Sequence, residues 1–406
     1  MAGNLNALAP VSEINTWVDL ANKAGAGVIN PETFYSKQLL DTIRYDADQY
    51  VYFRLADEAP IQEKADKLML RRWAPLQAHT VPLEEGVPPK SDRGSVEKYE
   101  LTAAQYGRYM EFSDKVDFQV VDPVIAHYSR EYSLVAMETL DLLARETLLS
   151  IANKFYAGQA ANFEALTPDS RPSMADLRLI VLALKKALVK PRVNGRYHVI
   201  GSPEFFYDMI SDPIVEKYMT INQTTKTMYD NSSLVPMFEM EFYETMLVPT
   251  SSEYVSNNKV YRRMYRSDGQ GGYEYDKIAE DNDTYVSTVD GYVKDARTGQ
   301  DASYIPGRKV WDIAAWNTAN KSNGADWYEL KAQHILIVGK DALTRTGLAG
   351  EGQARMYVKQ KGSSGVLDPI DQRQSIGFKI NSVGFGSTRL EAVVDYICIP
   401  SQVNPI

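Results

Sequence analysis

The chain has 406 residues, of which 44 are Lys or Arg and 53 are Asp or Glu, giving a formal net charge of −9. Hydrophobic residues make up 44% and charged residues 24% of the sequence, which is a globular composition and argues against disorder over most of the chain. The length predicts two or three domains. The negative balance argues against a protein whose main task is to wrap nucleic acid or coat an anionic membrane, because both need clustered positive charge.

The sequence offers little for disulfide, zinc or membrane chemistry. Its one cysteine, Cys398, cannot form an intrachain disulfide, and with four scattered histidines it cannot build a Cys-rich zinc site. No signal-peptide pattern opens the sequence, and no apolar run reaches 18 residues. We therefore expect a protein of the reducing cytosol that does not cross a membrane. Its 26 tyrosines, against 12 phenylalanines, suit extensive interfaces.

Residues 1–66 are predicted to form an N-terminal arm. The first 33 residues are mostly small and polar and include Gly25, Gly27 and Pro31, so they have no core of their own. Apolar residues then recur at three- and four-residue steps, which predicts an amphipathic helix over 33–54.

Residues 67–114 have the pattern of a long β-hairpin. Two β-prone runs, 68–73 and 99–112, are separated by a charged stretch that contains Pro88, Pro89 and Gly94. A two-stranded hairpin of this kind has too little core to be rigid in water. We expect it to need a neighbouring surface.

A long helix is predicted over 123–158. Asp122 is a candidate N-cap, Pro123 suits the first helical position and Gly158 is a candidate terminator. About 35 residues at 1.5 Å each give a rod of roughly 50 Å. Its apolar face is broader than a coiled-coil seam, which indicates a helix laid across a sheet.

Alternating helices and strands follow. Ser173 and Asp176 have the spacing of a capping box for a second helix, whose apolar stripe runs to Leu188 and which Pro191 stops. A strand over 197–200, a short helix over 203–210 and late strands over 334–338 and 390–399 give the chain α+β character. Residues 251–325, rich in Tyr, Asp, Asn, Gly and Ser, predict an inserted β module.

No pattern in the sequence indicates a catalytic, cofactor-binding or metal site. Glu84 and Glu85 are adjacent, whereas catalytic carboxylates need opposed positions. The acidic run 281–283 is interpreted as a turn, with a structural cation as the alternative. The glycine-rich stretches 269–272 and 384–386 are expected to be turns, because neither has the sequence of a phosphate-binding loop.

The histidines and the cysteine are interpreted as packing residues rather than catalysts, since no second ligand follows any histidine at helical spacing and Cys398 lies in an apolar strand. A basic group near the end of the second helix either complements the helix C-terminus or contacts phosphate. The histidines are His79, His127, His198 and His334, and the basic group is Lys185, Lys186, Lys190, Arg192 and Arg196.

The order of these parts resembles the major capsid proteins of tailed phages, which have the Hong Kong 97-type fold, and in particular the branch typified by coliphage N-four. That branch pairs an acid-Gly-x-x-Pro loop with a Gln-Tyr-Gly strand. The resemblance covers 33–249 and 328–401, whereas 251–325 departs from the shorter family members. The motifs that carry it are Thr33-Phe34-Tyr35-Ser36-Lys37-Gln38-Leu39-Leu40, Arg71-Arg72-Trp73, Leu83-Glu84-Glu85-Gly86-Val87-Pro88-Pro89, Gln105-Tyr106-Gly107-Arg108-Tyr109, Ser113-Asp114 and Gly377-Phe378-Lys379.

The resemblance implies an α+β capsid fold divided along the chain. The N-terminal arm would be 1–66, the extended β-hairpin loop 67–114, and the spine helix with part of the peripheral domain 115–172. The axial and peripheral core would be 173–250, a β-rich insertion domain 251–327, and the completion of the axial and peripheral sheets 328–406. No catalytic residue, cofactor or metal is implied, and no Lys–Asn crosslink is assigned.

The implied function is a structural protein of the virion that assembles in the host cytoplasm into homo-hexamers and homo-pentamers. Its partners would be a separate scaffolding protein, a portal, a possible decoration protein, and packaged double-stranded DNA held without sequence specificity. A membrane would not be a partner. The residues expected to make assembly contacts are Tyr35, Arg72, Trp73, Glu85, Gly86, Pro88, Gln105, Tyr106 and Gly107.

An alternative function rests on the insertion. Its tyrosines could stack on sugars, which would make 251–325 a carbohydrate-binding or enzymatic module. The competing interpretation is that they form the core of the insertion and a contact between subunits. The tyrosines concerned are Tyr254, Tyr261, Tyr265, Tyr273, Tyr275, Tyr285 and Tyr292.

Overall fold

The computed structural model describes residues 50–61, 67–74, 93–113, 124–221, 237–256, 259–268, 272–279, 286–294, 301–320, 326–348, 354–359 and 372–401, with positions 76, 78, 80 and 82. The chain divides into two compact units. One comprises Met1–Ile151 with Asp341–Leu390, and the other Ala152–Lys340 with Glu391–Ile406.

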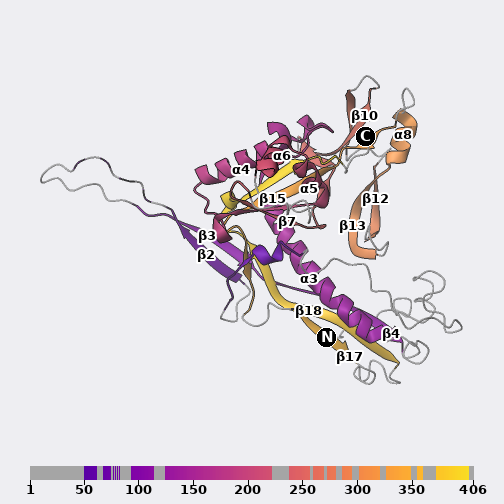
Figure 1. Ribbon diagram of the computed structural model, residues 1–406. Helices are drawn as coiled ribbons and strands as arrows, with labels where there is room; N and C mark the ends of the chain where they lie inside the picture. The colour runs from indigo at the N-terminus through magenta and orange to yellow at the C-terminus, as the bar shows by residue number, and fades with distance from the viewer. Residues whose placement is uncertain are drawn as a thin grey trace. The chain divides into compact units, whose positions relative to one another are not determined.

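The sheet of the first unit is organised around one long strand, β18 (Arg373–Gly386). Strands β4 (Ala104–Ser113) and β17 (Ala354–Lys359) both pair antiparallel with its first half, so they flank it on opposite sides (Figure 1). The end of β18 pairs with β16 (Thr344–Thr346), which pairs in parallel with β1 (Asp57–Glu58). This sheet therefore joins segments from the beginning, the first third and the last part of the chain.

Helix α3 (Val124–Ile151) packs on this sheet, as its broad apolar face predicts. It has 28 residues, about 42 Å, and is shorter than expected because residues 153–156 form strand β5 instead of a last helical turn. Gly158 has a φ of 65° in the 3-10 turn after β5, and so does not end the helix. Asp122 and Pro123 lie outside the described residues. The shared core is Phe112, Tyr132, Ala136, Leu140, Ile376, Phe378, Ile380 and Val383.

The hairpin differs from its prediction in one strand. Strand β2 (Lys67–Trp73) pairs antiparallel with β3 (Val96–Thr102), but the predicted second run, 99–112, is divided at Ala103, because β4 pairs with β18. The stretch 384–386, expected to be a turn, lies in β18. A Cβ on Gly384 would lie 2.3 Å from the carbonyl oxygen of Thr102, so the glycine allows the two backbones to approach. Pro88 and Pro89 are outside the described residues.

The described end of the arm is held against the first unit. Residues 1–49 lie outside the described residues. Of the predicted helix 33–54, residues 50–52 are not helical, and the 3-10 helix η3 (Phe53–Leu55) follows them. The amide of Phe53 donates to Asp141 of α3 at 2.8 Å, and the Arg345 guanidinium lies 4.6 Å from the Phe53 ring centroid.

The second unit contains a six-stranded sheet in the order β5-β19-β15-β6-β7, with β8 (Thr250–Ser251) pairing with β15. The predicted strands are confirmed as β6 (Tyr197–Gly201), β15 (Ala332–Val338) and β19 (Val393–Cys398); β5 is Asn153–Tyr156 and β7 is Met240–Glu244. The predicted short helix is α5 (Pro203–Ile210), followed by α6 (Pro213–Ile221). Every residue of β6 and β19 is buried, including Cys398.

The second predicted helix is α4 (Met174–Lys186), and its cap is more elaborate than a capping box. The Ser173 hydroxyl accepts from the Ala175 amide at 3.1 Å, as expected. The Tyr396 hydroxyl accepts from the Ser173 amide at 3.3 Å and donates to Asp176 at 3.0 Å, so a tyrosine from β19 stands between the two capping residues. Leu188 is 80% exposed with a φ of 56°, and so does not belong to the buried stripe.

The insertion is β-rich, as predicted. Strands β9 (Glu253–Ser256), β10 (Lys259–Ser267), β11 (Tyr273–Ala279) and β14 (Tyr328–Glu329) form one sheet, and β12 (Val286–Lys294) pairs with β13 (Asp301–Trp311). Helix α8 (Ile313–Asn320) follows. Between β10 and β11 the Asp268 amide donates to the Gly272 carbonyl at 3.0 Å, and residues 269–271 lie outside the described residues. The core is Met264, Ile278, Trp316 and Trp327.

Candidate assembly surfaces

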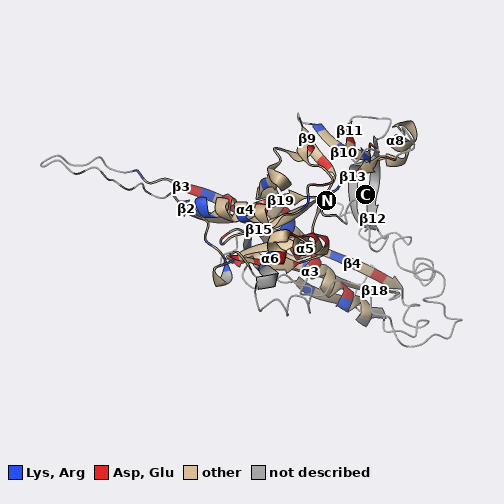
Figure 2. Ribbon diagram, turned by 45° about the horizontal axis from the view of Figure 1, so that its top comes forward, with Lys and Arg blue, Asp and Glu red and all other residues tan. Residues whose placement is uncertain are grey.

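The β2–β3 hairpin has two unlike faces because strand side chains alternate. On one face Leu68 lies opposite Leu101, which is buried, and Leu70 lies opposite Tyr99. The other face is exposed and mixes charged residues with large apolar ones. Charged positions lie on both strands (Figure 2). Its apolar members, Met69 and Trp73, are 52% and 72% exposed.

Contacts at both ends of the paired strands join the hairpin to its own unit. Arg72 donates to the carbonyl oxygen of Thr388 at 3.4 Å, and Leu101 lies where a Cβ on Gly386 would be. Lys67 forms an ion pair with Glu100 on the exposed face, and a hydrogen bond to that carboxylate raises the pKa of Lys67. These contacts leave Trp73 available to another surface.

The predicted assembly residues fall on two different sheets. Arg72 and Trp73 lie on β2, while Gln105, Tyr106 and Gly107 lie on β4. Tyr106 packs against the α3 core, and Gly107 allows a close approach to β18, since a Cβ there would lie 2.8 Å from the Phe378 carbonyl oxygen. Gln105 is exposed. Tyr35, Glu85, Gly86 and Pro88 lie outside the described residues.

A second exposed surface lies on the sheet face opposite α3. Tyr109 of β4 and Tyr357 of β17 are both paired with Gly377 of β18, so the two rings flank a strand position without a side chain. They are 61% and 45% exposed. Lys379 is exposed on the same face. Sequence reasoning missed this surface, because the pairing of β4 with a strand more than 250 residues later leaves no local signal.

The insertion tyrosines pack within the second unit. The Tyr254 ring stacks on Phe163 at 5.4 Å and on Tyr261 at 5.7 Å, and Tyr265 contacts Tyr273 at 5.9 Å. Burial raises the pKa of Tyr265 to about 12. Tyr285 and the side chain of Tyr292 lie outside the described part. Tyr254, Tyr261, Tyr265 and Tyr273 therefore contact one another or Phe163, whereas Tyr275 is 38% exposed and its ring faces Arg263.

Arg263 joins the insertion to the rest of the second unit. It is 7% exposed, donates to the Phe163 carbonyl at 2.8 Å and lies 4.6 Å from the Tyr275 ring centroid. Lys277 pairs with Glu164 at 3.4 Å on the same face. This face of the insertion thus makes an internal contact.

The histidines have structural partners where they are described. The His334 Nδ1 lies 2.8 Å from Asp395, and His198 lies 3.8 Å from Glu241. Burial, aided by Arg192, lowers the pKa of His198. His127 contacts the neighbouring Tyr128 ring on α3 at 5.4 Å, and His79 lies outside the described part.

Cys398 and the acidic residues do not form a reactive group. The thiol is fully buried, and burial raises its pKa well above the usual value, which suits the inert interpretation. Within the described ranges no three His, Cys, Asp or Glu side chains are grouped to hold a metal ion. Residues 281–283 lie outside those ranges. In the described part no helix is long and apolar enough to span a membrane.

Asp141 is a buried carboxylate at the junction of the arm and α3. It is fully buried, and one oxygen accepts from the Phe53 amide. Burial raises its pKa to about 6, although the backbone amide of Phe53 and the nearby Arg145 oppose that shift. The negative charge of Glu138 on the same helix raises the pKa of Asp141 further.

Comparison with solved structures identifies the fold. The capsid structure of cyanophage P-SCSP1u matches with a TM-score of 0.55 at 10% identity, covering 96% of this chain and 98% of the other. The capsid of Ralstonia phage GP4 matches with a TM-score of 0.55 at 11% identity, covering 92% of this chain and 97% of the other. The capsid of cyanophage Pam1 matches with a TM-score of 0.56 at 9% identity, covering 91% of this chain and 97% of the other. No family model and no curated protein sequence matches the chain. At these identities the likeness shows that this chain has the α+β fold of phage capsid proteins.

Proposed function

We propose that this chain is the major capsid protein of a tailed double-stranded DNA phage, with a structural role in the virion. The observation that carries the proposal is a likeness to phage capsid structures over more than nine tenths of both chains. The likeness spans the insertion as well as the two sheets. A chain that shares a whole fold with shell proteins is expected to share their way of assembling.

The β2–β3 hairpin supports self-assembly on physical grounds. It exposes Trp73 and Met69 on one face, and a two-stranded hairpin gains rigidity only on a neighbouring surface. In a ring of identical copies each such contact is repeated, so contacts that are individually modest can together stabilise a hexamer or pentamer. We assign Arg72 and Trp73, with the predicted Tyr35, Glu85, Gly86, Pro88 and Gln105, to contacts of this kind. Tyr106 and Gly107 belong to the same prediction, but they pack within the first unit.

The finer parts of the proposal rest on the sequence motifs. They include membership of the branch typified by coliphage N-four and assembly in the host cytoplasm. They also include the division of the chain into arm (1–66), extended hairpin loop (67–114), spine helix (115–172), core (173–250), insertion (251–327) and completing sheets (328–406). A scaffolding protein, a portal and possible decoration protein are the proposed partners. The net charge of −9 suits a capsid shell that encloses DNA without binding it tightly.

A carbohydrate-binding or enzymatic insertion is less well supported. Sugar binding needs exposed rings, whereas Tyr254 and Tyr265 pack against other aromatic side chains of the same unit. The internal contact made by Arg263 favours a structural role for this face.

Electron microscopy of the purified full chain tests the proposal. Closed shells, or rings of five and six copies, are expected under assembly conditions. The hairpin variant Trp73→Ser is expected to prevent their formation while the chain stays folded. Monodisperse monomers under every assembly condition would contradict the proposed function. Shells that form normally without the hairpin would contradict the role assigned to the hairpin.

A further inference from the structure

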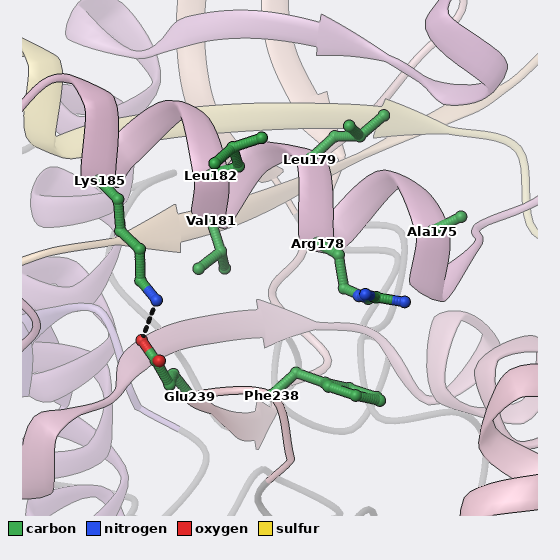
Figure 3. Close-up of a pocket in the computed structure, with 8 residues that line it drawn as sticks. All are labelled: Ala175, Arg178, Leu179, Val181, Leu182, Lys185, Phe238 and Glu239. Carbon is green, nitrogen blue, oxygen red and sulfur yellow. Dashed lines mark ion pairs between the residues drawn. The ribbon is translucent and has the colours of Figure 1, made fainter.

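A groove runs along the outer face of α4. It has a volume of about 600 Å³ and lies between this helix and the turn that precedes β7 (Figure 3). Helix α4 contributes Ala175, Arg178, Leu179 and Leu182, and the turn contributes Phe238 and Glu239. All belong to the second unit, so the groove is complete within one compact body.

Apolar side chains that line the groove are exposed. Val181 points toward the turn, whereas Leu179 and Leu182 project from the outer side of α4 (Figure 3). Leu179, Leu182 and Phe238 are 39%, 47% and 38% exposed, although α4 buries its opposite stripe normally. Leucines at positions 179 and 182 stand three residues apart, so they present one continuous ridge.

The turn that forms the second wall is strained. Met237 and Met240 exchange backbone hydrogen bonds at 3.2 and 2.9 Å, which leaves Phe238 and Glu239 as the two central residues, with φ of 50° and 63°. Turns of this type favour Asn and Gly, and a non-glycine residue in the left-handed region costs about 1–2 kcal/mol. Strain of this kind is concentrated at functional sites.

The strain places both side chains in the groove. The Arg178 guanidinium lies 5.2 Å from the Phe238 ring centroid, and Lys185 pairs with Glu239 at 2.6 Å (Figure 3). Lys186 and Lys190 are exposed beyond the pair. The rim therefore carries more positive than negative charge. Its occupant should have an apolar stripe flanked by acidic residues.

One segment of this chain has that pattern. Ile14, Trp17, Val18 and Ala21 follow the i, i+3, i+4, i+7 spacing of a helix with one apolar face. Ser12 is a suitable N-cap and Gly25 a suitable end. Glu13 and Asp19, against the single Lys23, give the segment a net charge of −1, which is opposite in sign to the rim of the groove.

We propose that residues 12–25 of one copy dock as an amphipathic helix in the α4 groove of a neighbouring copy. The inference rests on the proposed self-assembly and names the acceptor of the arm. With 33–50 helical as predicted, the chain from Gly25 to Tyr50 can span roughly 50 Å, at about 3.4 Å per extended and 1.5 Å per helical residue, which is enough to reach another subunit. Apolar contact supplies affinity, and the charged rim sets the direction of the helix.

Cysteine crosslinking in the assembled full chain tests this docking. Val18→Cys is combined with Leu182→Cys and treated with a short bismaleimide, using a mixture of isotope-labelled and unlabelled copies. The native Cys398 is fully buried and does not compete. The control pairs Val18→Cys with Tyr207→Cys, because Tyr207 is 61% exposed on α5. We expect mixed-isotope crosslinks between 18 and 182 in at least tenfold excess over the control pair.

The outcomes separate this inference from the proposed function. Shells without excess crosslinking, or crosslinks only within one copy, would overturn the docking and leave the capsid function intact. Absence of shells from the unmodified chain would overturn the function itself. A second measurement does not depend on the cysteines: Leu182→Asp should abolish amide-exchange protection of residues 13–24 in the particle, and unchanged protection would contradict the proposal.

Discussion

The central sheet of the second unit and the β2–β3 hairpin are built from the same kind of strand but stabilised in opposite ways. Every residue of β6 and β19 is buried, whereas β2 alternates between exposed and half-buried residues along its whole length. The central sheet is therefore stabilised by residues of its own chain. The hairpin keeps Trp73 and Met69 exposed, which is useful only if a neighbour covers them.

The largest expected effect is in the buried sheet. Leu336 of β15 is fully buried, so Leu336→Ala should lower the free energy of unfolding by about 2–5 kcal/mol through lost burial and the cavity left behind. Denaturant titration of the unassembled chain measures it. The matched control is Met69→Ala on the exposed face of the hairpin, where a change within about 0.5 kcal/mol is expected. Equal losses of unfolding free energy in the two variants would contradict the difference drawn between the buried sheet and the hairpin.

The root of the arm should show a pH dependence. The pKa of Asp141 is raised from 3.8 to about 6, so the folded state disfavours the charged form, and stability present at low pH is lost as the pH rises through about 4 to 6. The loss is at most about 3 kcal/mol. Asp141→Asn retains an acceptor for the Phe53 amide and should flatten this part of the stability profile, measured by denaturant titration between pH 4 and 8.

The same experiment has a control on the same helix. Glu138→Gln removes a neighbouring charge without removing the buried carboxylate, and should leave most of the dependence in place. A profile for Asp141→Asn that matches the unmodified chain would show that this carboxylate is not held in an unfavourable charged state.

Two glycines distinguish the packed sheet from the hairpin. A Cβ on Gly377 would lie 2.5 Å from the Arg108 carbonyl oxygen, so Gly377→Ala should destabilise the first unit by about 1–3 kcal/mol. Gly94, near the start of β3, has nothing within 4 Å, and Gly94→Ala should be neutral or slightly stabilising. Thermal unfolding of the two variants checks the pair, and a larger loss from Gly94→Ala would contradict it.

Local patterns predicted the elements whose partners are close in sequence. The Ser173 cap of α4, the strand at 197–201 and the short helix at 203–210 all follow from spacing and capping residues. The division of the run 99–112 did not, because it depends on the pairing of β4 with β18. For the same reason the helical pattern beyond Ile151 was misleading, since 153–156 pairs with β19.

The candidate surfaces were predictable only in part. An exposed hairpin follows from its composition, and Trp73 was expected to make contacts. The row formed by Tyr109, Gly377 and Tyr357 could not be found, because three strands bring it together. The α4 groove had a faint signal, since Leu179 and Leu182 lie outside the buried stripe, but its second wall comes from a turn some 55 residues later.

The smallest effect on stability should accompany a large effect on assembly. Trp73 is 72% exposed on β2, so Trp73→Ser should change the free energy of unfolding by no more than about 0.5 kcal/mol. In an interface the same ring would be buried, and truncating a buried tryptophan anchor commonly costs 2 kcal/mol or more per contact, as an approximate figure. A ring of six copies repeats that loss six times, in the manner of any cyclic assembly.

Light scattering under assembly conditions should therefore show subunits where the unmodified chain gives shells. Leu76→Ser, at a position 67% exposed beyond the end of β2, is the matched control for a general loss of apolar surface. If both variants assemble normally, the hairpin face does not hold the shell together. If Trp73→Ser alone fails, the tryptophan is the anchor that a hairpin without a core requires.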